Sequence, residues 1–228
     1  MITQSAWLAR AGLRHGFLDR AESAAGGGDW ARALRGVGVT LPIATVRQVH
    51  GIDVATADGA QGVEADAIVT ARRGIAVGIV TADCVPALLL APQAGAVAAV
   101  HAGWRGAAAG VLEAALARLR HDFGAEPAEV EAVLGPAIGP CCYRVGPEVE
   151  AAFVARTGDT TAPAWHREEG RLVLDLRLAA RLLLEAAGVR TAQAVGPCTA
   201  CTPALASYRR DGAGAGRQLS FIGWTAGA

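Results

Sequence analysis

The chain has 228 residues, of which 52% are apolar and 18% charged, a composition typical of a folded globular protein and not of a disordered one. Basic and acidic side chains balance at 21 each, and the basic ones form no long run, which argues against a nucleic-acid partner. No apolar stretch reaches the roughly 18 residues of a membrane span, and the N-terminus lacks a signal-peptide pattern, so we expect a cytoplasmic protein with reduced thiols.

The first third of the chain predicts strands with little helix between them. Apolar and β-branched side chains favour strands at 13–18, 40–50, 65–70 and 74–81. Between the first two, Glu22–Asp29 is small and glycine-rich, and Asp29 can cap a short helix over Trp30–Arg35. Gly51 permits a sharp turn after the second strand, which leaves His50 at a strand end.

The stretch Thr81–Gly106 predicts two buried strands, Pro86–Ala91 and Gly95–Val100. Both are close to continuously apolar, as expected where both faces of a sheet are covered. If they pair antiparallel through the short turn between them, Cys84 and His101 become neighbours although they lie far apart in the chain. A thiol beside an imidazole makes either a metal site or a nucleophile–base pair.

The clearest predicted helix spans Gly106–Phe123, where large apolar side chains recur at steps of three and four along one face. It follows His101 and Arg105 directly. Its free N–H groups and positive dipole end would therefore point at the suspected site and favour an anion such as phosphate.

The second half of the chain alternates strands and helices. Strands are expected at 130–135, 172–174, 189–195 and 218–224, and helices at 148–156 and 176–187, the latter capped by Asp175. The segment Gly158–Gly170 predicts a polar surface loop. With no repeat and no break in composition, we expect a single domain, 1–228. Adjacent strand pairs with separate helices favour an α+β fold, with mixed β-sheets flanked by helices in a layered sandwich.

Two histidines and a cysteine are the candidate metal ligands. His50, Cys84 and His101 each lie at a predicted strand end. Two imidazoles and a thiolate suit Zn²⁺, and three protein ligands leave a fourth position for water or substrate. A zinc ion there would make hydroxide available near neutral pH. On spacing alone, buried structural Cys and His side chains remain the alternative.

Two carboxylates and five arginines accompany these residues. Asp66 and Asp83 lie beside apolar strands, where a carboxylate can orient a metal-bound histidine, act as a general base or cap a turn. Arginine forks bind phosphate or carboxylate in bidentate fashion, and the candidates next to glycine-rich loops are Arg47, Arg105, Arg209, Arg210 and Arg217. Surface charge is the alternative for each arginine, least so for Arg105.

The remaining cysteines give a weaker pattern. Cys198 and Cys201 form a Cys-x-x-Cys motif, which can be a redox pair or half of a zinc ribbon. The chain has no second such motif, and the adjacent Cys141 and Cys142 suit tetrahedral ligation poorly. These observations favour ordinary thiols packed near the site.

Taken together, these motifs carry a family resemblance that covers nearly the whole chain. The matching segments are RHGF (14–17), QVHG (48–51), ADAIVT (65–70), TADCVPALLL (81–90), AVHAGWRG (99–106), LGPAIGPCCYRVGPEV (134–149), CT (198–199) and SYRRDGAGAGR (207–217). They resemble the bacterial laccase-like proteins, or multicopper polyphenol oxidases. Members of that family are now described as purine nucleoside phosphorylases, with adenosine deaminase and methylthioadenosine phosphorylase activity.

The resemblance implies mixed sheets flanked by helices, similar to the catalytic domain of cytotoxic necrotizing factor. It implies a zinc site at His50, Cys84 and His101, with copper the less favoured metal, and catalytic roles for Cys84, His101, Asp83 and Asp66. Purine nucleoside and phosphate would be the substrates. Their binding residues would be Arg47, Gln48, Arg105, Cys142, Tyr208, Arg209, Arg210 and Arg217.

The chain departs from the family pattern in two places. Arg144 stands where the family often has an acidic residue, which affects nucleoside preference. The segment 21–30 replaces a longer loop, so substrate contacts from that loop are not expected.

The function expected from these motifs is a zinc-dependent purine nucleoside phosphorylase acting on inosine, adenosine, guanosine and methylthioadenosine, with adenosine deaminase activity. One rival is a metal-free Cys84–His101 hydrolase that edits peptidoglycan precursors. A second is a copper-dependent phenol oxidase, which would need more histidines than the five present. A third, non-enzymatic reading is a small-molecule binding protein that keeps the pocket.

Overall fold

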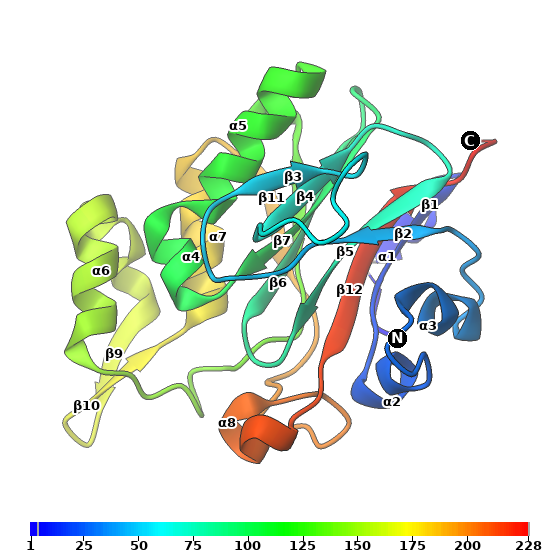
Figure 1. Ribbon diagram of the computed structural model, residues 1–228. Coiled ribbons are helices and arrows are strands. Elements are labelled where there is room, and N and C mark those ends of the chain that lie inside the picture. Colours follow the sequence, from blue (N-terminus) through cyan, green and yellow to red (C-terminus); the bar gives the residue numbers. More distant parts are fainter. Residues whose placement is uncertain (4, 228) are drawn as a thin grey trace.

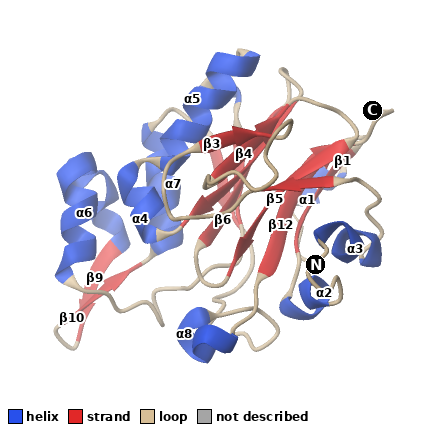
Figure 2. Ribbon diagram, in the orientation of Figure 1, coloured by secondary structure: helices blue, strands red, loops and turns tan. Residues whose placement is uncertain are grey.

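Two mixed β-sheets packed face to face, with helices on both outer faces, form the body of the computed structural model (Figure 1). The structure describes residues 1–3 and 5–227. Colouring by secondary structure separates the strands in the middle from the helices on either side (Figure 2). The expected α+β class, with mixed sheets flanked by helices, is confirmed. The comparison with cytotoxic necrotizing factor stays a prediction.

The larger sheet has six strands in the order β11-β8-β6-β7-β4-β3. Their bounds are β3 Val54–Thr56, β4 Ala67–Thr70, β6 Val85–Ala91, β7 Ala96–Ala102, β8 Glu131–Leu134 and β11 Thr191–Ala194. The outer pairs β3–β4 and β8–β11 are parallel, and the inner pairs are antiparallel.

The smaller sheet has four strands in the order β1-β12-β5-β2, and a separate hairpin joins β9 to β10. The bounds are β1 Leu13–Phe17, β2 Ile43–Thr45, β5 Ile75–Thr81, β12 Gln218–Trp224, β9 Trp165–Glu168 and β10 Arg171–Leu174. Only the β2–β5 pair in the smaller sheet is parallel.

The helices divide between the two outer faces. They are α1 Ser5–Leu8, α2 Arg20–Ala24, α3 Trp30–Gly36, α4 Trp104–Ala109, α5 Val111–Phe123, α6 Pro147–Thr157, α7 Leu176–Ala186 and α8 Tyr208–Asp211. Helices α4, α5 and α7 pack on the six-stranded sheet, α6 packs beside α4, and α3 packs on the four-stranded sheet. In order, the layers are helix, four-stranded sheet, six-stranded sheet and helix.

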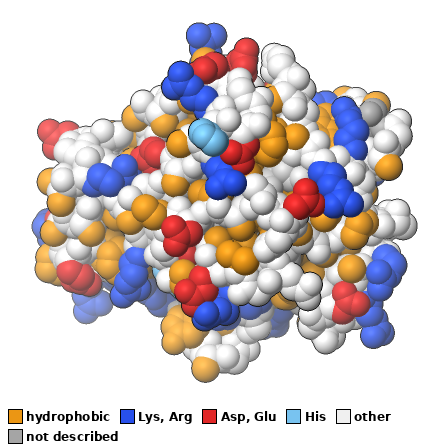
Figure 3. Space-filling model, turned by 45° about the horizontal axis from the view of Figure 1, so that its top comes forward, with side chains coloured by type: hydrophobic (Ala, Val, Ile, Leu, Met, Phe, Trp, Pro, Cys, Tyr) orange, Lys and Arg blue, Asp and Glu red, His pale blue; other side chains and the backbone are white. Residues whose placement is uncertain are grey.

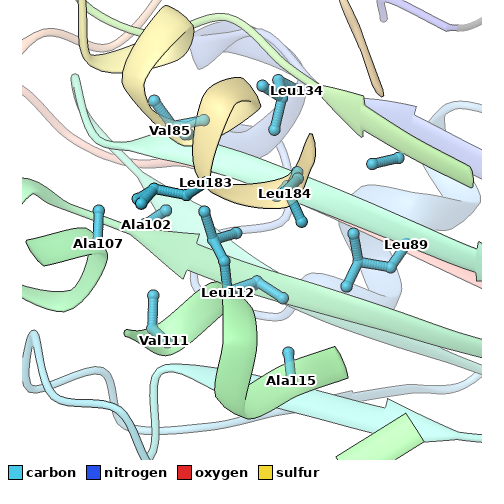
Figure 4. Packing of buried hydrophobic residues seen from close by; sticks show 14 of the residues in the cluster. Val85, Leu89, Ala102, Ala107, Val111, Leu112, Ala115, Leu134, Leu183 and Leu184 are labelled. Carbon is cyan, nitrogen blue, oxygen red and sulfur yellow. The ribbon is translucent and has the colours of Figure 1, made fainter. Parts of the chain in front are cut away.

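Strand β6 shows how the sequence builds these layers. Successive side chains of a strand point to opposite faces. Leu88 and Leu90 pack between the two sheets, whereas Leu89 packs on the helix side. In Figure 4, Leu89 lies near side chains of α5 and α7 such as Leu112 and Leu184. Because both faces are covered, the strand is apolar along its whole length, as the sequence predicted.

The expected antiparallel pair in the middle of the chain is confirmed. Strands β6 and β7 run antiparallel with Pro86 opposite His101, which brings Cys84 close to that histidine. The capped helix α3 and the last strand β12 also lie where the sequence placed them. The strand expected over 40–50 is shorter, since β2 ends at Thr45 and His50 lies in the following loop.

Several short elements were not predicted. Strand β3 has three residues, strand β9 four and helix α2 five. Each is too short to show a periodic pattern of apolar residues. Helix α2 depends instead on a capping box in which Asp19 and Glu22 each accept a backbone hydrogen bond from the other. Strands β4 and β5, which follow one another in the chain, lie in different sheets.

The helix expected over 106–123 is interrupted, and this prediction was wrong. The six-residue α4 ends at Gly110, whose φ of 108° is a left-handed conformation that glycine adopts readily, and α5 starts at the next residue. The long helix therefore does not point its N-terminus at the site. Only the short α4 begins there, directly after Gly103.

Charges are mixed over the surface. On the face drawn in Figure 3, arginines and carboxylates are interspersed among apolar and uncharged side chains. In the described part of the chain, no helix is both long and apolar enough to cross a bilayer.

Candidate metal centre and substrate pocket

The three predicted metal ligands meet at one end of the β6–β7 pair. His50 comes from the loop between β2 and β3, Cys84 directly precedes β6, and His101 is near the end of β7. Their ligand atoms all lie within 4.8 Å of one another. The two imidazole rings meet edge to face, with centroids 4.8 Å apart. The proximity expected from the sequence is therefore present.

A buried carboxylate contacts the His101 ring and the backbone of the His50 loop. Asp66 is fully buried, and its Oδ1 lies 2.7 Å from Nδ1 of His101. The same carboxylate accepts hydrogen bonds from the backbone N–H groups of Val49, His50 and Gly51. The loop that carries His50 is thus tied to the residue that orients His101. A carboxylate that accepts the outer N–H of an imidazole leaves the other ring nitrogen free for a metal ion.

The acid–base properties of the site follow from these contacts. Burial raises the pKa of the Cys84 thiol, but hydrogen bonds from His101 and His50 outweigh it and bring the pKa down to about 6. Burial lowers the pKa of His101, but hydrogen bonds to Asp66 and Cys84 outweigh it and raise the pKa to about 9. Asp66 keeps a lowered pKa despite desolvation, because His101 and two backbone N–H groups favour its charged form. The site therefore favours a thiolate.

The backbone around the ligands is specialised. His50 has a φ of 61° and Asp83 a φ of 87°, a region that side chains other than glycine rarely adopt. Gly103 leaves room for two of the ligands, since a Cβ there would lie 3.0 Å from the Cys84 sulfur and 3.1 Å from the His50 ring. Strained residues that persist in a fold cluster at functional sites.

The donor set fits a divalent metal ion. Two imidazoles and one thiolate are borderline and soft ligands that suit zinc, and copper is the next metal in order of preference. The surroundings are shaped to hold these ligands. Gly103 leaves room for Cys84 and His50, and the carboxylate of Asp66 orients His101. With three protein ligands, a fourth coordination position remains for water or substrate.

A cavity of about 550 Å³ lies in front of the three ligands. This volume is in the range of small-molecule binding sites. Its wall includes five of the residues expected to bind substrate or phosphate: Gln48, Arg105, Tyr208, Arg209 and Arg217.

Arg105 is the most available of these cations. Its guanidinium carbon lies 4.4 Å from the centroid of the Trp104 ring, a cation–π contact that fixes the plane of the group. Among the described residues, no carboxylate forms an ion pair with it. Arg209 is more engaged, because its guanidinium donates to the carbonyl oxygens of Cys142 and Arg144.

Gln48 has a structural contact as well as a place in the cavity wall. Its side-chain amide donates to the carbonyl oxygen of Val80 and accepts from the backbone N–H of the same residue. This two-point contact fixes the residues just before His50 to the edge of β5.

Three expected substrate-binding residues lie outside the cavity wall. Arg47 forms an ion pair with Glu64, and Arg210 donates to backbone carbonyls of the loop 199–205 and to Asp211. Cys142 has its sulfur near Cys201. Arg144, where the family often has an acidic residue, is near Glu168 and also lies outside that wall.

Asp83 lies in the cavity wall and joins three segments of the chain. Its carboxylate accepts from the Thr199 hydroxyl at 2.6 Å and from the backbone N–H of Arg209 at 2.6 Å. Its own carbonyl oxygen accepts from the N–H of Ile138. Both carboxylate oxygens are thus occupied, an arrangement that suits positioning more than proton transfer.

Sequence reasoning missed two residues of this region. Tyr143 lines the cavity and lies under the Arg209 guanidinium, 5.3 Å from it. Thr199 anchors Asp83. Both lie in loops rich in Pro, Gly or Cys, where no repeating pattern of apolar residues is present to guide a prediction. An aromatic residue inside such a loop was the one available signal for Tyr143.

Curated relatives of this chain bear a common name. A purine nucleoside phosphorylase of Pseudomonas aeruginosa is 44% identical over 166 residues, which cover 72% of this chain and 67% of the relative. One from Streptomyces griseus is 39% identical over 197 residues, covering 83% of this chain and 78% of the relative.

Solved structures share the fold. A Neisseria meningitidis protein superposes with a TM-score of 0.80 at 33% identity, over 96% of this chain and 97% of the other. YlmD from Geobacillus stearothermophilus gives a TM-score of 0.79 at 28% identity, over 94% and 93%. A family model matches residues 18–225. The chain therefore belongs to the family described as multi-copper polyphenol oxidoreductase laccase.

Proposed function

We propose that this protein is a zinc-dependent purine nucleoside phosphorylase. The observation that carries the proposal is the meeting of His50, Cys84 and His101 with the guanidinium of Arg105 at one cavity. The names of the curated relatives support the reaction class. Candidate nucleosides are inosine, adenosine, guanosine and methylthioadenosine, with phosphate as the second substrate.

Phosphorolysis breaks the bond between C1′ of the ribose and the purine nitrogen, forms a C1′–O bond to phosphate, and leaves a proton on the purine. A pocket for this reaction must hold a phosphate anion against the sugar. Arg105 and Arg217 supply positive charge in the cavity wall. A bound zinc ion would supply a Lewis acid, with His50, Cys84 and His101 as its ligands.

The other polar residues of the site have positioning roles in this proposal. Asp66 orients His101 and the His50 loop, and Asp83 fixes Thr199 and Arg209. Tyr143 and Trp104 offer aromatic surface in the cavity, which suits the flat face of a purine.

Substitution of one ligand tests the proposal. In protein purified without an affinity resin, His101→Ala should lose the zinc ion of this site and at least about 100-fold of its inosine phosphorolysis, since even partners of metal ligands cost 10–100-fold. The control is His121→Ala, whose exposed side chain is paired with Asp122 away from the cavity. Unchanged zinc content together with unchanged phosphorolysis in His101→Ala would refute the assignment.

Adenosine deamination is proposed as a second activity of the same cavity. It needs water in place of phosphate, and the metal centre offers a position for it. Production of inosine from adenosine in phosphate-free buffer tests it. Loss of this product in His101→Ala would link it to the same ligands.

Two other reactions are alternatives at the same cavity. Cys84 next to His101 also fits a thiol hydrolase acting on peptidoglycan precursors, and the family description names copper oxidation of phenols. A strong chelator separates the thiol reaction from phosphorolysis, because it stops the metal-dependent reaction and spares thiol hydrolysis. Metal analysis of the purified protein distinguishes zinc from copper.

A further inference from the structure

A second group of sulfur atoms lies apart from the metal centre. Cys141 and Cys142 follow β8, and Cys198 and Cys201 follow β11. The four sulfurs lie within 4.8 Å of one another. The cluster faces outward, with Cys141 and Cys201 exposed and the other two half-buried. None of the four lines the cavity in front of His101.

The topology of the sheet brings these sulfurs together. Strands β8 and β11 are parallel neighbours, so the loops that follow them leave the sheet at the same edge. The pairing continues beyond the strands, where Ala137 and Cys198 form an isolated bridge and Thr199 donates to the carbonyl oxygen of Ala137. Main-chain pairing therefore holds together the two loops that carry the cysteines.

The sulfur separations match a tetrahedral metal site. The Cys201 sulfur lies 3.4 Å from that of Cys142 and 3.6 Å from that of Cys141. A disulfide requires about 2.05 Å. Four sulfurs at the usual zinc–sulfur distance of about 2.3 Å stand about 3.8 Å apart at the corners of a tetrahedron. The spacing is that of thiolates around a shared ion.

Gly139 makes the approach of the two loops possible. A Cβ at this position would lie 3.1 Å from the Cys198 Cβ and 3.4 Å from the Cys141 sulfur. Its backbone N–H donates to the Cys198 sulfur at 3.2 Å. Hydrogen bonds of this kind favour the charged form of a thiol, which is the form that binds metal. Gly103 plays the same spatial role beside Cys84.

Cationic side chains hold the same two loops. Arg210 donates to the carbonyl oxygens of Thr199 and Thr202, on either side of Cys201. Arg209 donates to the carbonyl oxygen of Cys142. These contacts tie each loop to a neighbouring cationic side chain.

We propose that Cys141, Cys142, Cys198 and Cys201 form a second metal centre, a tetrathiolate site for zinc, in place of the ordinary thiols that the sequence favoured. A closed site with four protein ligands is structural and not catalytic. It fastens the loop 136–143, which brings Tyr143 to the cavity, to the loop 196–201, whose Thr199 anchors Asp83. This centre keeps the cavity wall in place from outside.

Metal counting on three forms of the chain tests this centre separately from the first. The unmodified protein, purified under reducing conditions without an affinity resin, should hold two zinc ions per chain. Cys201→Ser and His101→Ala should each hold one. After cobalt substitution, the absorption of a tetrahedral tetrathiolate should appear in the unmodified protein and in His101→Ala, and be absent in Cys201→Ser.

The His101→Ala form keeps the cluster untouched, so the test survives if a cysteine variant does not fold. X-ray absorption at its zinc edge should give four sulfur neighbours at about 2.3 Å. Histidine or oxygen neighbours, or no zinc in that form, would overturn the proposal. So would a thiol titration of unreduced protein showing a single free cysteine, since the four would then be paired as disulfides. Two zinc ions without phosphorolysis would contradict the proposed function and leave the tetrathiolate centre standing.

Discussion

Asp66 is the residue on which the geometry of the metal centre depends. It is fully buried, and its two oxygens receive three backbone N–H groups and the His101 ring. A buried carboxylate is stable only when its lone pairs are satisfied. Here the partners are the backbone of the His50 loop and the side chain of His101, so fold stability and ligand placement depend on the same group.

Replacement of Asp66 by Asn should lower both the stability of the fold and the affinity for zinc. The amide nitrogen of Asn would face N–H donors, so at least one donor would lack an acceptor. The expected loss in the free energy of unfolding is about 1–3 kcal/mol. Zinc affinity should fall about 10–100-fold, the usual effect of losing the partner of a metal-bound histidine. Chelator competition and thermal unfolding measure the two effects. Asp122→Asn, at an exposed pair with Arg118, is the matched control. Equal zinc affinity in the two variants would contradict this role.

A single methyl group tests the close approach at Gly103. Its φ of −69° is open to any residue, so Gly103→Ala introduces no backbone strain. The added Cβ would press on the Cys84 sulfur and the His50 ring. We expect zinc affinity to drop while the fold persists. Gly36→Ala, where no atom lies within 4 Å of the new Cβ, should change neither. If Gly103→Ala binds zinc like the unmodified protein, the ligands are not held as described.

The metal ligands could be predicted from the sequence more readily than the side chains around them. His50, Cys84 and His101 stood out because the apolar strands around them fix a register that brings two of them together. The arginines were harder to assign. Arg105 stood out by its place before a predicted helix, but the neighbouring Arg209 and Arg210 look alike in sequence. Arg209 lies in the cavity wall, whereas Arg210 binds backbone carbonyls. Side-chain partners that come from distant loops leave no local pattern.

At the scale of elements, the break between α4 and α5 is the feature the sequence concealed. The large apolar side chains of the stripe all follow the break, and the alanines before it also favour a helix, so the sequence predicts one helix. Gly110 interrupts the helix, and the guanidinium of Arg156 in α6 donates to the carbonyl oxygens of Ala107 and Ala108 just before it. Long-range contacts thus set the helix boundary, as the pairing with β4 sets the short strand β3.

Removal of the Arg156 donors should destabilise this junction. Arg156→Met keeps the length of the side chain and leaves two carbonyl oxygens without their partner. The expected loss is about 1–3 kcal/mol, or about 2–4 °C in Tm for each kcal/mol in a chain of this size. Arg120→Met, which removes only a surface pair with Glu126, should change stability by less than about 0.5 kcal/mol. Equal Tm values for the two variants would rule out the bridging role.

At the scale of the whole molecule, the six-stranded sheet belongs to two cores at once. One face packs on the helices and the other on the four-stranded sheet. The layered class followed from the composition of the strands, because runs apolar on both faces require cover on both sides. The order of strands did not follow, since β4 and β5 are adjacent in sequence and yet lie in separate sheets.

Neighbouring leucines on β6 test whether the layers form one cooperative domain, as we propose for residues 1–228. Leu88 faces the other sheet and Leu89 the helices, and both are fully buried. Each Leu→Ala substitution should cost about 2–5 kcal/mol. If the cores unfold together, both variants shift a single transition that tryptophan fluorescence and far-ultraviolet circular dichroism report at the same midpoint. Because the two side chains differ only in the face they occupy, a second transition in one variant alone would assign that face to a separately folding unit.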